Sequence, residues 1–503
     1  MPINQIKIGA ILSYISIFLS VVVSFSYTPF MLKYMGQAEY GLYSLALTIV
    51  SYLSLMDFGF GAAIVRYSTI YRHKEEKEKL YELYGLFFKM YTIIGVVCFV
   101  VGIGLYFLTP YFFSKTLNPD ELTKIKIIIL IIVTYLSLSF PFSVFSAIIT
   151  SFEKFIFLKA MNIVRSLLVP LIMIPLLLLG YKSITMTIVM VGVGVLISIV
   201  NVFYCFRNLE IKIKFTNYKK ELIMSILGFS LLVFGKDFFE RITWSSGQFI
   251  LGSTIGAVSV AIFAIAIQIK GYYETFCKTL TNLFLPRIVS YTTKEDFLKH
   301  FEVLFIKLGR IQFHLLGYIM VIYLLVGESF INLWAGHNYN TAYKLSLFIM
   351  IPYTIPLIQS LGGAFLQAVN KLRIQLYIYG LEALIIVILT VVLSKYLGIY
   401  SAALALCIGI FVSEIILINI YWKTLGINIW SFWKEIFKIF IPLLIFCIIG
   451  YFIFVNISIH SLKQLCIYVV LITIPYVFYI YRFGMNSYER GIIATIINKI
   501  YKR

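Results

Sequence analysis

Charged residues are scarce in this 503-residue sequence. Asp, Glu, Lys and Arg together make up only 13% of it, whereas 61% of the residues are hydrophobic. A soluble protein could not hide that share of apolar side chains in globular cores. The composition therefore excludes a soluble protein and predicts that lipid is the main solvent of the chain.

Signatures of enzymes and of metal sites are missing as well. The six cysteines stand singly, and the five histidines lack the spacing of metal ligands. Gly228 and Gly235 are followed by Lys236, but not by the Ser or Thr of a P-loop. We therefore expect neither an enzyme nor a bound cofactor or metal.

Long apolar runs take the place of the short alternating segments that an outer-membrane barrel would need. A spanning helix takes about 20 apolar residues, and it satisfies its backbone groups internally. The predicted fold class is thus an all-α polytopic membrane protein with about 14 transmembrane helices. The expected spans are residues 8–30, 41–65, 84–109, 125–147, 156–179, 184–206, 222–244, 248–273, 303–326, 342–366, 374–394, 398–421, 436–456 and 464–482.

The net charge of +20 follows the loops between these spans, and no separate basic domain indicates nucleic-acid binding. Alternate loops carry nearly all of the Lys and Arg residues, and positively charged short loops stay in the cytoplasm. The opposite set of loops holds only Lys33, Lys115, Lys124, Lys182, Lys395 and Lys463. We therefore predict a multi-pass protein of a cytoplasmic (inner) membrane, with an even number of spans and both termini cytoplasmic.

The sequence resembles itself at an offset of 220 residues. The offset pairs Tyr52 with Tyr272 and aligns the charged runs at residues 74–76 and 294–296. Chance agreement between two aromatic-rich helices is the alternative. Six spans separate the paired segments, which predicts two six-helix bundles related by an axis along the membrane normal. The predicted domains are residues 1–210 for the first bundle, 211–425 for the second, and 426–503 for two further helices and a cytoplasmic tail.

Ionisable residues inside spans are costly, and they usually face a bundle interior or a water-filled cavity. On the expected seventh span, helical spacing places Lys236 beside Glu240. The same spacing places Asp237 beside Arg241, so both charge pairs can form locally. A position at the helix end, with the charges reaching the membrane interface, is the alternative to a cavity.

Further cations lie in neighbouring spans. Lys270 and Glu274 form another pair at four-residue spacing, and either cavity lining or interfacial anchoring fits them. Arg165, Arg310 and His314 have no opposite charge adjacent in sequence. Such cations could contact a pyrophosphate or an acidic sugar, because Arg offers planar bidentate donors.

Three lone acids complete the set of candidates. Asp57 precedes a Phe-Gly-Phe-Gly run that loosens a helix, and Arg66 follows nine residues later, which indicates ion coupling or gating. Glu382 and Glu414 could bind a coupling cation or a proton, or could make a quiet interhelical hydrogen bond.

Two groups of site residues follow from these patterns. The substrate-cavity candidates are Arg165, Lys236, Arg241, Lys270, Arg310 and His314. The candidates for ion coupling or gating are Asp57, Arg66, Asp237, Glu240, Glu274, Glu382 and Glu414.

Short glycine-aromatic motifs resemble those of a known family. Residues 33–43 (KYMGQAEYGLY), 57–61 (DFGFG) and 64–67 (IVRY) resemble the opening of bacterial polysaccharide flippases, the exporters of O-antigen and capsule repeat units. Residues 251–253 (LGS) and 261–264 (AIFA) resemble the same feature in the second half of that family. These flippases belong to the multidrug, oligosaccharidyl-lipid and polysaccharide exporter superfamily.

The resemblance implies two bundles around a cationic cavity that opens alternately to either side. It implies movement of undecaprenyl-pyrophosphate-linked oligosaccharide from the cytoplasmic to the outer leaflet, coupled to a sodium or proton gradient, for cell-surface polysaccharide biosynthesis. The expected partners are that lipid-linked oligosaccharide, the coupling ion and membrane lipids, and they could include a polysaccharide polymerase and other glycan-assembly proteins.

Three other function classes remain open at this point. A cation-coupled multidrug or lipid-precursor exporter belongs to the same superfamily and would act without a polyprenyl carrier. A polytopic polysaccharide polymerase or ligase would need a sizeable outward loop with catalytic residues, and no such loop is expected here. A scaffold for a glycan-assembly complex would tolerate neutralisation of the charges inside the spans.

Overall fold

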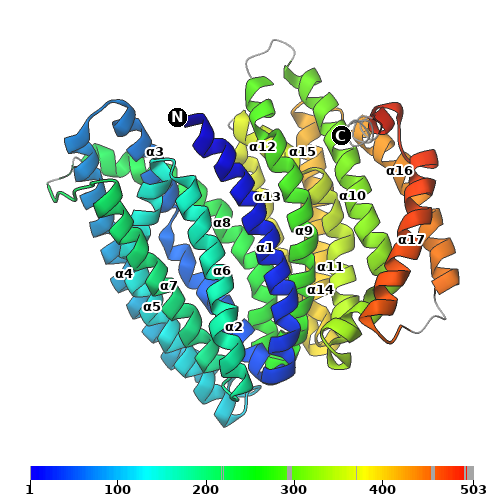
Figure 1. Cartoon of the computed structure of the whole chain (residues 1–503), viewed down its shortest axis with the longest axis horizontal. Helices are drawn as coiled ribbons and strands as arrows, with labels where there is room; N and C mark the ends of the chain where they lie inside the picture. Colours follow the sequence, from blue (N-terminus) through cyan, green and yellow to red (C-terminus); the bar gives the residue numbers. More distant parts are fainter. Residues whose placement is uncertain are drawn as a thin grey trace. The chain divides into compact units, whose positions relative to one another are not determined.

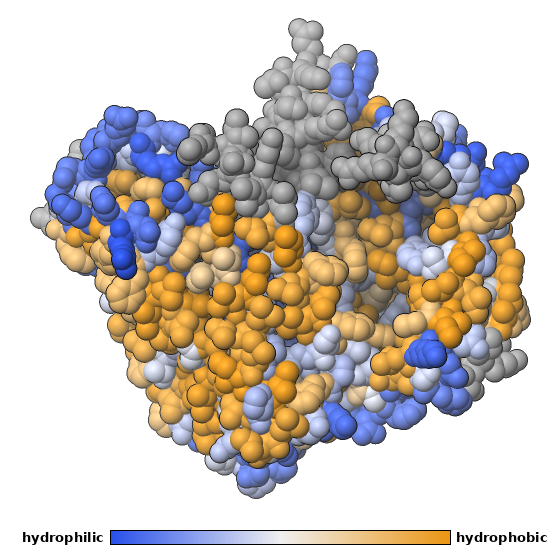
Figure 2. All heavy atoms as spheres, in the orientation of Figure 1, coloured by the Kyte–Doolittle hydropathy of each residue, from blue (hydrophilic) through white to orange (hydrophobic). Residues whose placement is uncertain are grey.

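The computed structural model describes residues 2–216, 218, 220–291, 297–369, 371–454, 459–491 and 494. Every regular element in these residues is helical (Figure 1). Thirteen of the described helices or helix runs are long and apolar enough to cross a membrane. On the face drawn in Figure 2, hydrophobic side chains cover broad areas of the helices and hydrophilic ones gather near helix ends. The predicted class, an all-α polytopic membrane protein, is confirmed.

Compactness divides the chain into two units. Unit 1 comprises Met1–Ala264 and Thr390–Ile399. Its helices are α1 (Pro2–Met35), α2 (Gln37–Leu53), the short turn η1 (Ser54–Asp57), α3 (Phe60–His73), α4 (Lys77–Phe113), α5 (Pro119–Ser151), α6 (Phe155–Leu178), α7 (Ser183–Asn208) and α8 (Lys220–Thr254). Within it, α5 packs against α4 and α7, α1 against α6, and α2 against α8.

Unit 2 comprises Ile265–Leu389 and Tyr400–Arg503. Its helices are α9 (Ala257–Tyr291, whose first residues belong to unit 1), α10 (Phe297–Trp334), η2 (His337–Tyr339), α11 (Thr341–Ile358), α12 (Ser360–Ala368), α13 (Leu372–Leu397), α14 (Tyr400–Ile410), η3 (Phe411–Leu417), α15 (Ile418–Thr424), α16 (Ile429–Phe454) and α17 (Leu462–Phe483). Here α10 packs against α11, α16 and α17. The division into repeat-related bundles at residues 210 and 425 stays a prediction, since compactness places α8 with the first unit.

The expected break between the seventh and eighth spans is wrong. Residues 244–248 lie inside α8, which continues to Thr254, and α9 begins at Ala257. Two polar side chains at the expected break face α2: the hydroxyls of Ser245 and Ser51 lie 3.0 Å apart, and Gln248 accepts a hydrogen bond from Thr48. Interhelical bonds satisfy these side chains within the helix pair, so no loop is needed. α8 covers the seventh expected span, residues 222–244, and it is not among the thirteen helices or helix runs that qualify as spans in the described residues.

Two helices begin in the same way at the predicted offset. Gly36 and Gly256 stand 220 residues apart, have φ angles of 81° and 124°, and directly precede α2 and α9. The helices then differ, because α2 ends at Leu53 whereas α9 runs to Tyr291. The second charged run of the proposed repeat, residues 294–296, lies outside the described residues.

Gly41 on α2 allows the start of α9 to pack backbone against backbone. A Cβ at this position would lie 1.9 Å from the carbonyl oxygen of Ala257. We expect Gly41→Ala to lower the free energy of unfolding by about 1–3 kcal/mol through this overlap, measured by thermal unfolding of the purified protein. The control is Gly192→Ala on α7, where nothing lies within 4 Å and a gain of up to about 1 kcal/mol is expected. Equal stabilisation by both variants would contradict the close contact.

Candidate functional site

The second membrane span is broken in its middle. α2 ends at Leu53, the turn Ser54–Asp57 follows, and α3 starts at Phe60. Phe58 and Gly59 both have left-handed backbone angles, with φ of 51° and 74°. A bulky residue in this region costs about 1–2 kcal/mol, so surrounding contacts must hold the break in place.

Asp57 is half-buried at this break and accepts two hydrogen bonds. Tyr91 of α4 donates its hydroxyl to Oδ1, and the amide of Gly61 lies 3.5 Å from Oδ2. Tyr91 is fully buried and packs edge-on against Phe60, with ring centroids 6.0 Å apart. The carboxylate therefore anchors the broken segment to α4. Sequence reasoning found Asp57 but missed Tyr91, because 34 residues separate them and no spacing rule links the two.

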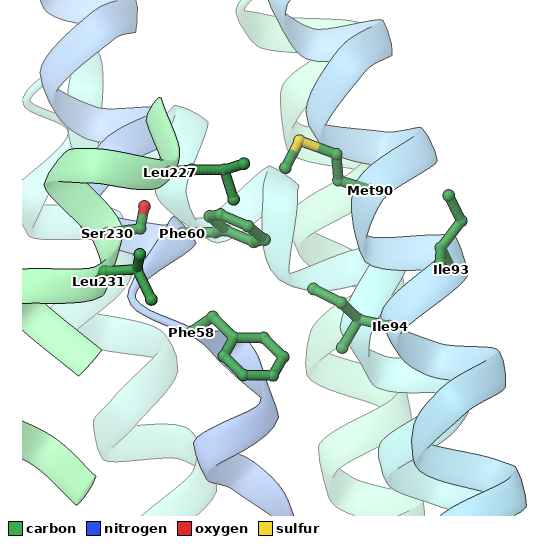
Figure 3. Close-up of a pocket in the computed structure, with 8 residues that line it drawn as sticks. All are labelled: Phe58, Phe60, Met90, Ile93, Ile94, Leu227, Ser230 and Leu231. Atoms are coloured by element: carbon green, nitrogen blue, oxygen red, sulfur yellow. The ribbon is translucent and has the colours of Figure 1, made fainter. Parts of the chain in front are cut away.

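A pocket of about 420 Å³ opens beside the break (Figure 3). The lining residues come from the break, from the start of α3, from α4 and from α8: Phe58, Phe60, Met90, Ile93, Ile94, Leu227, Ser230 and Leu231. Figure 3 shows the two phenylalanine rings lying between the α8 side chains and the α4 side chains. All but the serine are apolar, so the pocket suits hydrocarbon.

The four charges of α8 lie in the middle of that helix and on the surface of unit 1. Lys236, Asp237, Glu240 and Arg241 are all exposed. None of them makes a salt bridge within 4 Å in the described part of the chain, but Lys236 and Arg241 lie close enough to Asp237 to interact with it electrostatically. A position at a helix end is wrong, because α8 extends well beyond the charges on both sides. Charged side chains in the middle of a long helix favour polar surroundings over hydrocarbon.

In unit 2, Lys270 and Glu274 on α9 form the expected pair, with Nζ and Oε2 2.8 Å apart. Lys270 is only 5% exposed, and its ammonium lies 4.6 Å from the ring centre of Tyr353. Lys278 also binds Glu274, and the Tyr353 hydroxyl donates to Glu274 at 3.0 Å. Pairing and hydrogen bonding lower the cost of burying these charges.

Arg310 on α10 is buried, and all five of its N–H donors are used. Glu489 accepts from Nε at 2.6 Å and from Nη2 at 2.8 Å. Nη1 donates to the backbone oxygen and the carboxylate of Glu435 on α16, and Nη2 also donates to the carbonyl of Gly484. His314 Nε2 lies 3.2 Å from Glu489. Together these contacts fasten the segment after α17 to α10 and α16.

Glu489 lies beyond the last span and stays ionised in this cluster. Burial alone would raise its pKa, but hydrogen bonds from His314 and Arg310 outweigh burial and lower the pKa to about 2. The two acids stand 125 and 179 residues from Arg310, so sequence reasoning found no partner for it. The assignment of Arg310 and His314 to a substrate cavity stays a prediction, and in this structure the chain itself occupies the Arg310 donors.

The remaining candidates lie apart from these clusters. Arg165 on α6 and Arg66 on α3 are exposed. Glu382 on α13 is 4% exposed, and Glu414 is half-buried in the π-helical turn Phe411–Leu417. The described residues contain no cluster of three or more His, Cys, Asp or Glu side chains that could hold a metal ion.

The structure distributes the candidates over both units. Those of unit 1 are Asp57, Arg66, Arg165, Lys236, Asp237, Glu240 and Arg241, and those of unit 2 are Lys270, Glu274, Arg310, His314, Glu382 and Glu414. Within unit 2, Lys270 forms a salt bridge with Glu274. Arg310 and His314 lie together because both contact the carboxylate of Glu489.

Sequence comparison finds relatives along most of the chain. A family model described as polysaccharide biosynthesis protein matches residues 7–290, more than half of the chain. The uncharacterised membrane protein EpsK of Bacillus subtilis (strain 168) is 23% identical over 416 residues, covering 80% of each chain. A candidate O-antigen transporter of Shigella flexneri is 20% identical over 401 residues, covering 78% of this chain and 92% of that relative.

Solved structures share the fold at low sequence identity. The lipid II flippase MurJ in an inward closed conformation has a TM-score of 0.73 and 15% identity, covering 94% of this chain and 99% of that one. An inward-facing multidrug resistance transporter of the MATE family, from the MOP superfamily, has a TM-score of 0.62 and 14% identity, with coverage of 86% and 99%. The resemblance read from the glycine-aromatic motifs is confirmed.

Proposed function

Because this chain belongs to the polysaccharide biosynthesis protein family, we propose that it is a flippase that moves a lipid-linked saccharide across the bilayer. Its substrate is an undecaprenyl-pyrophosphate-linked oligosaccharide repeat unit, carried from the cytoplasmic to the outer leaflet of a bacterial membrane by alternating access. The product feeds the assembly of a cell-surface polysaccharide.

The observation that carries this proposal is the row of exposed charges in the middle of α8, none of which is held in a salt bridge within the described residues. Lys236 and Arg241 offer cationic donors to a pyrophosphate, and Arg can bind its oxygens in a bidentate way. A wholly apolar ligand would gain nothing from these groups and would desolvate them at a cost. An anionic head group on a lipid carrier therefore suits α8 better than a neutral apolar compound does.

Ligand protection of the purified protein tests the substrate class. A ligand that binds only the folded state stabilises it by about 2.7 kcal/mol at a concentration of 100 times its Kd. We expect the lipid-linked oligosaccharide to raise the thermal unfolding midpoint and a lipophilic cationic drug to leave it unchanged. Protection by the drug alone would favour a multidrug exporter instead.

Asp57 is the group that we propose couples transport to a sodium or proton gradient. A bound cation would compete with Tyr91 for the carboxylate, and protonation would weaken the hydrogen bond by removing the negative charge, so either event would loosen the broken segment from α4. Asn at this position can still accept the Tyr91 hydrogen bond, but it cannot bind a proton or pair with a cation.

Asp57→Asn is therefore expected to remove the stimulation of transport by an imposed gradient, with little change in stability. The measurement is the rate of transport in liposomes with and without sodium or proton gradients. Asp120→Asn is the matched control, because the Asp120 side chain is 81% exposed at the start of α5. Full gradient stimulation of Asp57→Asn would exclude this role.

A further inference from the structure

The pocket beside the broken span has the chemistry of a site for a hydrocarbon chain. We propose that the pocket between α4 and α8 binds part of the polyprenyl chain of the lipid-linked substrate. This inference rests on the proposed function, and it assigns one place in unit 1 to the carrier lipid.

The lining excludes the sugar part of the substrate. Ser230 is the only polar residue in the lining, is 1% exposed, and its hydroxyl has no hydrogen-bond partner within the described residues. A saccharide would leave most of its hydroxyl groups without partners here, which is costly in an apolar site. A volume of about 420 Å³ holds a stretch of chain and leaves no room for an oligosaccharide.

The pocket is open at its side, so a chain can enter without passing through the unit. Ile93 on α4 is 56% exposed and Leu231 on α8 is 60% exposed, and both line it. The inner wall is aromatic: the rings of Phe58 and Phe60 are 6.4 Å apart, and Phe58 packs on Phe234 at 5.1 Å. Such a wall offers large, stiff apolar contact to a methyl-branched chain.

Cations stand at one end of the pocket. α4 and α8 start at the same end of unit 1, because the backbone of Lys214, just before α8, donates to Tyr81 near the start of α4 at 3.1 Å. Lys89 is exposed and lies one helical turn nearer that end than Ile93, on the same face of α4. Glu82 lies two turns before Lys89, farther from the pocket.

Charge complementarity therefore favours a chain with an anionic head. The Tyr67 and Ser225 hydroxyls, 2.7 Å apart, join α3 to α8 at this end, and the exposed Arg66 precedes Tyr67. With its chain in the pocket, a polyprenyl phosphate would place its head toward Lys89 and Arg66. A diacyl lipid with a neutral head would gain nothing from these cations.

The same pocket connects the chain to the coupling acid. Phe58 directly follows Asp57, and Met90 directly precedes Tyr91, the hydrogen-bond partner of Asp57. A hydrocarbon chain in the pocket thus contacts the residues next to Asp57 and next to Tyr91. Binding or release of the chain therefore changes the packing around the broken segment. Chain occupancy and the state of Asp57 are linked through this contact.

Photolabelling of the reconstituted full chain tests the site. The probe is a sugar-free polyprenyl phosphate with a photoreactive group in its chain, and labelled residues are mapped by peptide mass analysis. We expect labels on α4 and α8 around the pocket. Leu231→Trp should reduce labelling about tenfold, because the larger side chain would exclude about two methylene groups of the polyprenyl chain from the pocket. Met224→Trp is the matched control on the same helix, since Met224 is 61% exposed and does not line the pocket.

Three results would overturn the inference: labels that map to other helices, equal labelling of Leu231→Trp and the wild type, or equally strong labelling by a photoreactive diacyl phospholipid. Transport of lipid-linked oligosaccharide by the wild type is measured in the same liposomes. Transport without pocket labelling would refute this site and leave the proposed function standing, whereas pocket labelling without any transport would refute the proposed function.

Discussion

Replacement of Arg310 by alanine is expected to lower the free energy of unfolding by about 3–5 kcal/mol. The change removes five hydrogen bonds and leaves the carboxylate of Glu489, which is 5% exposed, buried without its main partner. It also releases the segment after α17 from α10. Thermal unfolding of the purified variant measures the loss.

Two further variants distinguish the loss of the buried ion pair from the general effect of replacing an arginine in this region. Arg490→Ala is the matched control, because half-buried Arg490 donates side-chain hydrogen bonds only to the backbone oxygens of Tyr481 and Arg482 in the described structure and lies 5.5 Å from the ring centre of Tyr481. It should cost less than about 1 kcal/mol. The double variant Arg310→Met with Glu489→Met removes both charges and should recover much of the stability. A stable Arg310→Ala variant would contradict the structural role of the cluster.

The double variant also decides what Arg310 does in transport. A fold that remains stable without both charges and still transports would place Arg310 among the structural residues. Loss of transport in the stable double variant would support the cavity role that the sequence suggested. The comparison matters because the single variant alone would lose activity by either route.

Neutralising the cations of α8 is expected to have the largest effect on transport. Lys236→Gln with Arg241→Gln should lower the rate of flipping at limiting substrate by about 10- to 100-fold, the value of one charge-assisted contact to phosphate. Because both side chains are exposed and neither forms a salt bridge in the described structure, the thermal unfolding midpoint should fall little. The rate and the unfolding midpoint are measured on the same preparation.

Lys220→Gln is the matched control for the α8 variants. Lys220 is exposed at the first residue of α8, so it shares the helix and the substitution but not the position in the middle. It should transport at the wild-type rate. Equal rates for the wild type and the double α8 variant would remove these cations from the substrate path.

Periodicity and charge predicted the class of fold and most spans, because length and hydropathy are local properties of a sequence. The end of the seventh span was misplaced next to Ser245 and Gln248, whose hydrogen-bond partners on α2 are about 200 residues away. Partners at such separations leave no periodic signal. The spacing of polar residues in the sequence therefore cannot distinguish a loop from a helix face that hydrogen-bonds to another helix.

The candidate site shows the same limit. The Lys270 and Glu274 pair was predicted correctly because both residues share one helix face. The partners of Arg310 were missed because Glu435 and Glu489 come from other helices. Asp57 could be singled out from its neighbouring glycines, but the hydrogen bond from Tyr91 and the adjoining pocket depend on packing between helices.

The most direct test of the central claim is leaflet movement in liposomes that contain only this protein. A labelled lipid-linked oligosaccharide is placed in one leaflet, and its exposure to an impermeant reagent is followed over time, with and without imposed sodium or proton gradients. We expect protein-dependent loss of the label from the starting leaflet, slowed by Lys236→Gln with Arg241→Gln. A distribution that stays unchanged under every gradient would contradict the assignment as a flippase.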